Sequence, residues 1–387
     1  MNSNPFEDLS LDRLRLRTSK KWAFYPPDIL PAFVAETDFP LAPAVRAALD
    51  SALDSGDCGY AEPRGFGAVF AAFANARFGW PVDADRVFVV PDVMAGVIES
   101  IRAFSPPASA VVINPPVYPP FFETLAHDRR PIVEVPLLQD AQSGRWSLDF
   151  SGLEKAFAEG VGAYLLCSPH NPVGRVWPEA DLRRLAALAE RYHVLVVVDE
   201  IHAPLTMPGA TFVPYLTVSG YRQNAVAVTS TSKAWNIPGL KCALVVAGSE
   251  PTADRLRAHL TALETEIIDR TGQLGIVASL AAFRDGPEWL DALVKHLDSN
   301  RQLLAELLSK QIPGARYLAP EATYLAWIDC STLGIGTDPA AYFLERGRVA
   351  LARGLDFGKQ CSSFARLNFG TSSAILTEIV ERMARSL

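Results

Sequence analysis

Short apolar runs alternate with helical patterns along most of the chain. The runs are strand-sized and predict strands at residues 86–90, 110–113, 131–135, 163–167, 194–198, 225–228 and 243–246. Between them, apolar residues at helical spacing predict helices at residues 94–104, 121–127, 151–159 and 179–192. This alternation is typical of an α/β fold, in which helices flank a mostly parallel central sheet. The run 194–198 is apolar on both faces, which predicts a central strand of that sheet.

The pattern changes near residue 252, where it becomes helical as far as residue 308. It then predicts a strand, a helix, a strand and a last helix, which together make a smaller α+β domain. Five prolines between residues 26 and 43 break any long regular element, so we expect an extended arm on the surface there. The predicted division is an arm with part of the small domain at 1–45, a large domain at 46–280 and a small C-terminal domain at 281–387.

Two local signals are more specific. Ser151 and Glu154 have the spacing of a capping box, which predicts the start of the helix at 151–159. Gly65 and Gly67 lack the third glycine of a dinucleotide-binding loop and do not follow a predicted strand, so they carry no nucleotide-binding prediction.

Composition and charge exclude several classes of partner. The chain has 387 residues, 49% of them hydrophobic, which is enough to build a large core. Its 36 basic and 43 acidic residues give a net charge of −7, and the basic ones are dispersed. Binding to nucleic acid or to an anionic membrane surface is therefore not expected. No apolar run is long enough to cross a bilayer, and the first twenty residues lack the apolar core of a signal peptide, so we expect a cytoplasmic protein.

The cysteines do not form a recognisable framework. They are scattered singly at positions 58, 167, 242, 330 and 361, and none clusters with the six histidines. An odd, dispersed set of this kind favours reduced cysteines and predicts no metal site.

Polar side chains follow three neighbouring strands of the predicted sheet. Asn171 lies in a proline-rich turn after the strand at 163–167, Asp199 directly follows the run 194–198, and Lys233 follows Thr229–Ser232. Ligands bind at the carboxyl ends of parallel strands, so these side chains are candidates for a common site. Each also has a structural interpretation. Asn171 could bond its own turn, Asp199 could cap a helix or join a structural ion pair, and Lys233 could lie on the surface.

The three side chains together match one cofactor chemistry. A buried carboxylate can keep a pyridine nitrogen protonated, an amide can donate to a ring oxygen, and a lysine can form a Schiff base with an aldehyde. The hydroxyls and backbone amides at 229–232 suit a phosphate group. A pyridine aldehyde phosphate is therefore the expected ligand.

With these motifs in their order along the chain, the sequence resembles the fold-type I pyridoxal-phosphate enzymes of the class I/II aminotransferase superfamily. Within that superfamily it is most similar to the cystathionine β-lyase (C–S lyase) branch, the MalY/PatB group. The segments that carry the resemblance are Lys21–Trp22, 30–39, Gly59–Pro63, Pro91–Met94, Asn114–Phe121, Ser168–Gly174, Asp199–His202, Thr229–Lys233 and Phe364–Phe369. They extend from about residue 21 to the C-terminus.

The resemblance implies roles for individual residues. Lys233, Asp199 and Tyr118 would be catalytic, with Lys233 carrying the cofactor and Tyr118 stacking on its ring. The other implied cofactor-binding residues are Asn171, His202, Ser230, Val93, Met94, Lys241 and Tyr60. The implied substrate-binding residues are Arg366 for the carboxylate, and Asn171, Ala35 and Tyr60. In the family the tyrosine at the place of Tyr60 reaches the phosphate of the neighbouring subunit, which implies a homodimer with shared sites.

The sequence also departs from the family pattern at several positions. Asp92 stands where a glycine is common, Lys241 stands where aminotransferases have a phosphate-binding arginine, and His202 stands where they usually have tyrosine. The sequence Asp-Glu-Ile-His at 199–202 is the form of the lyase branch.

The expected activity is β-elimination on cystathionine or another S-substituted cysteine, which gives a thiol, pyruvate and ammonia. Transamination between an amino acid and a 2-keto acid uses the same residues and stays open as an alternative. A cofactor-bearing regulatory or binding protein is a third possibility from another class.

Overall fold

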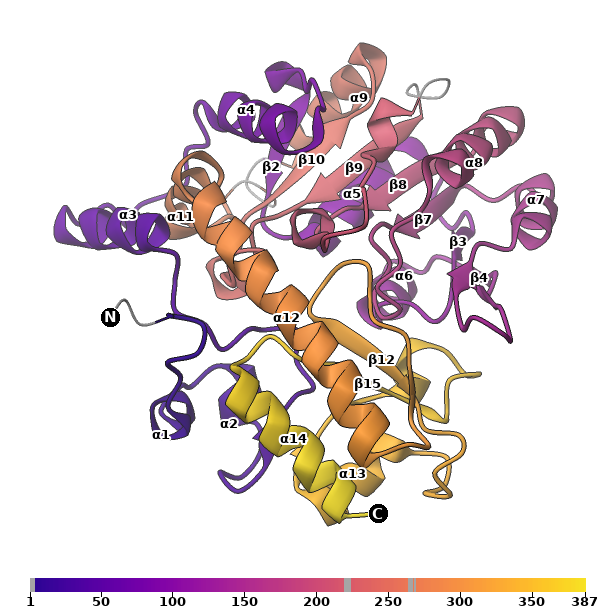
Figure 1. The fold of residues 1–387 in the computed structure, drawn as a ribbon. Coiled ribbons are helices and arrows are strands. Elements are labelled where there is room, and N and C mark those ends of the chain that lie inside the picture. The colour runs from indigo at the N-terminus through magenta and orange to yellow at the C-terminus, as the bar shows by residue number, and fades with distance from the viewer. Residues whose placement is uncertain (1–3, 219–223, 264–266, 268) are drawn as a thin grey trace.

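The computed structural model describes residues 4–218, 224–263, 267 and 269–387. A seven-stranded sheet forms the centre of the larger lobe (Figure 1). In spatial order its strands are β2 (Val87–Val90), β10 (Ala243–Ala247), β9 (Ala225–Thr229), β8 (Leu195–Asp199), β7 (Ala163–Cys167), β3 (Val111–Ile113) and β4 (Ile132–Glu134). Strands β9, β8, β7, β3 and β4 pair in parallel, whereas β10 runs antiparallel to both of its neighbours. The mostly parallel α/β sheet expected from the sequence is confirmed.

Helices cover both faces of this sheet because its central strands are apolar on both faces. Every residue of β7, β8, β9 and β10 is buried. Alternate residues pack into two separate clusters, so Val196 joins the cluster on one face and Val197 the cluster on the other. The helices on the first face are α4 (Phe66–Phe78), α7 (Phe150–Ala158), α8 (Glu179–Tyr192) and α11 (Gln273–Asp285). Those on the second face are α5 (Val93–Phe104), α6 (Pro120–His127) and α9 (Glu250–Thr261).

A four-stranded antiparallel sheet forms the smaller lobe. In spatial order its strands are β11 (Arg316–Tyr317), β12 (Leu325–Asp329), β15 (Phe364–Asn368) and β14 (Ala352–Arg353). Three helices belong to this part of the chain: α12 (Pro287–Gln311), α13 (Pro339–Gly347) and α14 (Ser373–Arg385). Figure 1 shows α12 as one long helix that runs from beside α11 down to the lobe of β12 and β15. The domain limits near residues 45 and 280 stay predictions.

The N-terminal segment is more tightly integrated than the expected surface arm. It forms α1 (Leu11–Arg15), α2 (Lys20–Ala23), β1 (Leu30–Pro31) and α3 (Pro43–Asp54). Strand β1 pairs in parallel with β13 (Val349–Ala350), which ties the arm to the C-terminal lobe. Phe6, Leu14 and Trp22, which precede the prolines, and Leu30 and Phe39, which lie between them, are all buried in the main core.

The capping box predicted at Ser151 and Glu154 is wrong. Helix α7 begins at Phe150, and its cap is Asp149, whose side chain accepts a hydrogen bond from the Gly152 backbone N–H at 3.0 Å. Asp149 is an equally good capping residue two positions earlier, so it satisfies the free N–H groups first.

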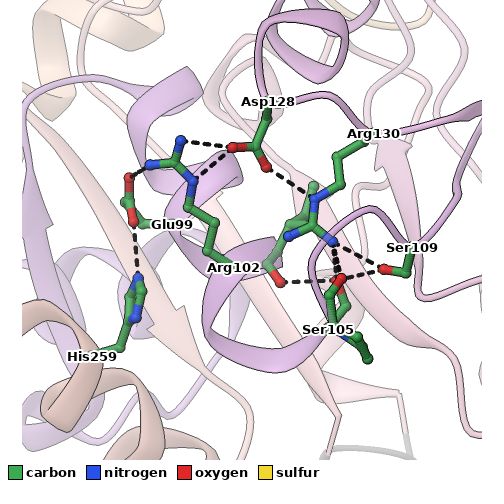
Figure 2. A network of polar contacts seen from close by, with 9 residues as sticks. Glu99, Arg102, Ser105, Ser109, Asp128, Arg130 and His259 are labelled. Carbon is green, nitrogen blue, oxygen red and sulfur yellow. Dashed lines mark hydrogen bonds and ion pairs between the residues drawn. The ribbon is translucent and has the colours of Figure 1, made fainter.

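A polar network holds α5 against its neighbours (Figure 2). Buried Glu99 on α5 contacts Arg102 at 2.7 Å and His259 of α9 at 2.9 Å. Arg102 continues to Asp128 at the end of α6, and Asp128 to Arg130. The Arg130 guanidinium also donates to two hydroxyls, those of Ser105 and Ser109. The network therefore fixes the position of α5, whose N-terminus points at the candidate site described below.

Two further properties concern the described part of the chain. No helix there is long and apolar enough to cross a membrane. Within the same ranges, no three His, Cys, Asp or Glu side chains lie together in a way that could hold a metal ion.

Candidate active site

The carboxyl ends of β7, β8 and β9 open into a cavity of about 250 Å³. Parallel strands end at the same edge of a sheet, so the turns after them converge. The residues predicted from the sequence that line this cavity are Val93, Met94, Tyr118, Asn171, Asp199, His202, Lys233 and Lys241. Four predicted residues, Ser230, Arg366, Ala35 and Tyr60, do not line it.

Asp199 is the last residue of β8 and is buried at the floor of the cavity. Burial raises the pKa of its carboxyl to about 6, although the Ile201 backbone N–H, which donates to Oδ1 at 3.0 Å, and the charge of Lys233 both oppose the rise. A buried carboxylate of this kind is stabilised by a cation or a protonated nitrogen placed against it.

Lys233 follows β9 and extends into the same cavity. Its Nζ donates a hydrogen bond to the Ala35 carbonyl oxygen at 3.0 Å. Burial lowers the pKa of the amine to about 8, and the nearby Arg366 charge lowers it further, against the opposing charges of Glu36 and Asp199. A lysine whose pKa is depressed to this extent has a substantial neutral fraction near pH 7–8, which is the form that acts as a nucleophile or a base.

Ala35 therefore acts through its backbone. Its carbonyl oxygen also accepts a hydrogen bond from the hydroxyl of buried Tyr324 at 2.8 Å. Asn236, three residues after Lys233, holds the next part of the arm by bonding the backbone N–H and carbonyl of Thr37, each at 2.8 Å. The arm is thus fixed directly against Lys233.

Arg366 lies on β15 behind Asn171, and 5% of its surface is exposed. Its Nη1 donates to Asn171 Oδ1 at 3.1 Å and its Nη2 to the Phe33 carbonyl at 2.9 Å, while its guanidinium carbon lies 4.9 Å from the centre of the Phe357 ring. Burial lowers its pKa to about 10. Among the described residues, no carboxylate pairs with this guanidinium and its Nε has no partner. A buried guanidinium without a counter-ion is suited to receive a carboxylate from a ligand.

Tyr118 and His202 cover other sides of the cavity. Burial raises the pKa of Tyr118 to about 12, so its phenol stays neutral. Burial also lowers the pKa of His202 to about 3, so this imidazole is neutral, and its Nδ1 has no partner among the residues described. The two rings offer a flat face and a neutral nitrogen to an aromatic ligand.

The end of the cavity at α5 is suited to an anion. Val93 is the first residue of this twelve-residue helix, so backbone N–H groups point into the cavity. Asp92 caps the helix by accepting from the Ala95 N–H at 2.9 Å, and its other oxygen accepts from Lys241 Nζ at 3.1 Å. Lys241 therefore brings a cation to this end, although Asp92 partly neutralises it.

The two serines before Lys233 differ in their exposure to the cavity. The Ser230 hydroxyl is buried and donates to the Cys242 carbonyl at 2.6 Å. Ser232, which the sequence indicates only as one of several consecutive hydroxyl residues, lines the cavity instead. Tyr60 lies on the surface with 85% of its area exposed.

Sequence reasoning did not single out two other residues near the site. Cys167 ends β7, pairs in register with Asp199 and lines the cavity; its position at a strand end is a signal that could have identified it. His170 is buried, and its Nε2 lies 2.8 Å from the Pro116 carbonyl, so it braces the turn that carries Asn171.

A sequence model for the aminotransferase class I and II family matches residues 34–383. The chain belongs to this family. The match covers both lobes and every candidate site residue, and leaves out only Lys21–Trp22 and residues 30–33 of the segments that carry the resemblance, so it confirms the resemblance derived from the motifs.

Members of the aminotransferase class I and II family with known names extend the comparison. The chain is 35% identical to the cystathionine beta-lyase of Corynebacterium glutamicum, over 97% of this chain and 99% of that protein. It is 33% identical to cystathionine beta-lyase PatB of Bacillus subtilis, over 93% of each chain. Among solved structures, cystalysin from Treponema denticola, which contains pyridoxal 5'-phosphate, superposes with a TM-score of 0.91 at 26% identity, over 100% of this chain and 99% of that chain. The fold-type I architecture of this family member is therefore confirmed.

Proposed function

We propose that the protein is a pyridoxal-phosphate-dependent carbon–sulfur lyase that cleaves an S-substituted L-cysteine, such as cystathionine, to a thiol, pyruvate and ammonia. The observation that carries the proposal is the placement of Lys233 and Asp199 in one cavity. Burial raises the pKa of the Asp199 carboxyl to about 6 and lowers the pKa of the Lys233 amine to about 8. The names of the relatives from Corynebacterium glutamicum and Bacillus subtilis support the choice of reaction.

The residues of the cavity fit this cofactor. Asp199 would hold a proton on the ring nitrogen, Asn171 and Tyr118 would orient the ring, and the unpartnered Nδ1 of His202 supplies one more polar contact. The N-terminus of α5, Ser232 and Lys241 would hold the phosphate. Ser230 would orient Ser232 for this contact, since the two hydroxyls lie 2.6 Å apart.

When bound, the cofactor supplies an electron-withdrawing ring that stabilises negative charge at the α-carbon of an amino acid. Arg366 and Asn171 would hold the substrate carboxylate, which orients the amino acid with its α-carbon near Lys233. Lys233 Nζ would then take the α-proton. Loss of the thiolate from the β-carbon completes the elimination; the thiolate takes up a proton to become the thiol, and water hydrolyses the released aminoacrylate to pyruvate and ammonia.

The test is to incubate the purified holoenzyme with cystathionine and with other cysteine S-conjugates, and to assay pyruvate and free thiol. Lys233→Ala should release neither product, and Lys310→Ala, an exposed lysine on α12, serves as the matched control. If the wild type gives no pyruvate and no thiol with any conjugate, the lyase proposal fails. A regulatory function that survives Lys233→Ala would favour the binding-protein alternative instead.

Transamination is the second candidate, and the family to which the chain belongs favours it. The same residues would serve, with Lys233 returning the proton to the cofactor carbon rather than leaving it on the products. A keto acid that retains the sulfur substituent would identify this reaction.

We also propose that the protein acts as a cytoplasmic homodimer in which Tyr60 of each subunit reaches the phosphate in the other. Its 85% exposure supports this, since a tyrosine with so much free surface is available to a second copy. Leu53 on α3, 56% exposed, supplies apolar surface on the neighbouring part of the chain. Sedimentation of the wild type and of Tyr60→Ala, with cofactor affinity measured for both, tests this.

A further inference from the structure

A second cavity, of about 620 Å³, lies apart from the candidate active site. A two-stranded hairpin of β5 (Leu138–Gln139) and β6 (Trp146–Ser147) forms one wall, and the four-stranded sheet of the smaller lobe forms the other. Neither Lys233 nor Arg366 lines it. The cavity is therefore a separate hollow where the two lobes meet.

An aromatic wall lines one side of this second cavity. Phe364 and Trp327 stack with their ring centres 5.1 Å apart and their planes at 9°, and Trp146 from the hairpin meets Phe364 edge-on at 6.2 Å. Trp327 is 6% exposed, and its Nε1 has no hydrogen-bond partner among the described residues. A buried N–H group without an acceptor is unfavourable, so an acceptor on a ligand would be stabilised there.

Opposite charges lie beside the aromatic wall. Arg316 on β11 and Asp329 on β12 are direct cross-strand partners, so their side chains share one face of the sheet, and both line the cavity. Within the described ranges they form no ion pair with each other or with any other side chain. Asp329 uses one oxygen to accept the Ser331 N–H at 2.9 Å, which leaves the other oxygen for a ligand.

This face of the sheet continues to the candidate active site. Asp329 pairs with Phe364 and Trp327 pairs with Arg366, so all four side chains lie on the same face. The Phe357 ring is shared, because the Arg366 guanidinium lies 4.9 Å from its centre and the Trp327 ring lies 5.2 Å from it. A molecule in the second cavity would thus contact Trp327, which packs against the Phe357 ring that supports Arg366.

We propose that this second cavity binds a free α-amino acid with an aromatic or large apolar side chain. Arg316 and the Trp327 N–H receive its carboxylate, Asp329 receives its ammonium group, and Trp146 and Phe364 contact its side chain. The charges on the wall match the two charges of a zwitterion, and the stacked rings match a planar or apolar group.

The test is calorimetric titration of the holoenzyme with L-phenylalanine. Arg366→Ala separates the two sites, because it removes the active-site partner for a carboxylate and retains Arg316, Trp327 and Asp329, which line the second cavity. In that variant we expect the titration to show binding, and we expect Arg316→Gln or Asp329→Asn, added to it, to weaken binding about tenfold or more. The amide of L-phenylalanine, which lacks the carboxylate, should bind as weakly as L-phenylalanine binds to the Arg316→Gln protein.

Control variants accompany the titration. Arg346→Gln removes an exposed arginine of α13 outside the cavity and should leave the affinity unchanged. Arg366→Gln, which also removes the charge, replaces Arg366→Ala if circular dichroism shows that the latter does not fold. Binding that disappears with Arg366→Ala and is unaffected by Arg316→Gln and Asp329→Asn would overturn the proposal, as would the absence of binding in every protein. The lyase assay on the same preparations is independent, since a failure of the proposed activity does not change the outcome of the titration.

Discussion

Arg366 donates a hydrogen bond to Asn171 at 3.1 Å, although the two residues lie 195 positions apart in the sequence. Asn171 belongs to the turn after β7 in the large sheet, and Arg366 to β15 in the small one. The bond therefore joins the two lobes at the point where a substrate carboxylate would be held. Neither residue brings a negative charge, so the pair retains its capacity to bind an anion.

Replacement of Arg366 should mainly weaken substrate binding. Arg366→Ala removes a charge-assisted bidentate contact, and we expect kcat/KM for cystathionine to fall about 30- to 100-fold, mostly through KM. Arg366→Lys should recover part of the loss, because it restores the positive charge but not the two parallel N–H donors of a guanidinium. Steady-state kinetics measures both, with Arg346→Ala as the exposed control. A KM unchanged in Arg366→Ala would rule out the assigned role.

Removal of the charge on Asp199 should reduce turnover without destabilising the protein. Asp199→Asn keeps the shape of the side chain but cannot hold a proton on a ring nitrogen, so we expect kcat to fall about 10²- to 10⁴-fold. The melting temperature of the apoprotein should not fall, because a buried charge has been replaced by a neutral amide. Kinetics and thermal melts, compared with exposed Asp140→Asn, check both statements. Full activity in Asp199→Asn would contradict the assignment.

Cofactor loading should depend on pH through Lys233. Its pKa is depressed to about 8, chiefly by burial, and only the neutral amine can attack an aldehyde. The rate of cofactor capture by the apoprotein should therefore rise with pH and level off above about pH 8, whereas an ordinary lysine would level off above about pH 10. The growth of the visible absorption band after mixing measures this rate. A rate that is still rising steeply at pH 9–10 would contradict a depressed pKa.

Neutralising Asp92 should tighten cofactor binding. Its carboxylate caps α5 and pairs with Lys241 at the end of the cavity proposed to hold the phosphate. Asp92→Asn keeps a capping oxygen while removing a negative charge, so we expect the dissociation constant of the cofactor to fall about three- to tenfold. Asp92→Ala also loses the cap and should lower the free energy of unfolding by about 1 kcal/mol. Equilibrium dialysis measures the cofactor affinity, and urea melts measure the free energy of unfolding. Weaker cofactor binding by Asp92→Asn would contradict the prediction, because it would show that the carboxylate of Asp92 helps to bind the cofactor.

The sequence predicts the large sheet well because its central strands are apolar on both faces. Strands β7 and β8 are buried throughout, and the apolar runs 163–167 and 194–198 identify them without help from periodicity. The hairpin of β5 and β6 was not predicted, since each strand has two residues and the connecting turn is polar. The arm was expected on the surface because its helices α1 and α2 have only five and four residues, too few to show a helical pattern, and prolines interrupt the segment after them.

The residues of the candidate site also differ in how far the sequence predicts their positions. Asn171, Asp199 and Lys233 follow consecutive parallel strands, so strand order alone brings them together. Arg366 lies on a different sheet, and no spacing in the sequence indicates that it approaches Asn171; its prediction depended on the resemblance to a family. The difference between Ser230 and Ser232 depends on which hydroxyl reaches the Cys242 carbonyl, a contact that only the folded chain reveals.

The most direct test of the proposed lyase activity is the ratio of free thiol to pyruvate released from L-cystathionine by the holoenzyme. β-Elimination predicts one thiol and one ammonia for each pyruvate, with continued turnover when no keto acid is added. It also predicts that Lys233→Ala releases none of the three above the background. A keto acid that keeps the sulfur substituent, formed without free thiol and only while an amino-group acceptor is supplied, would contradict the proposed reaction.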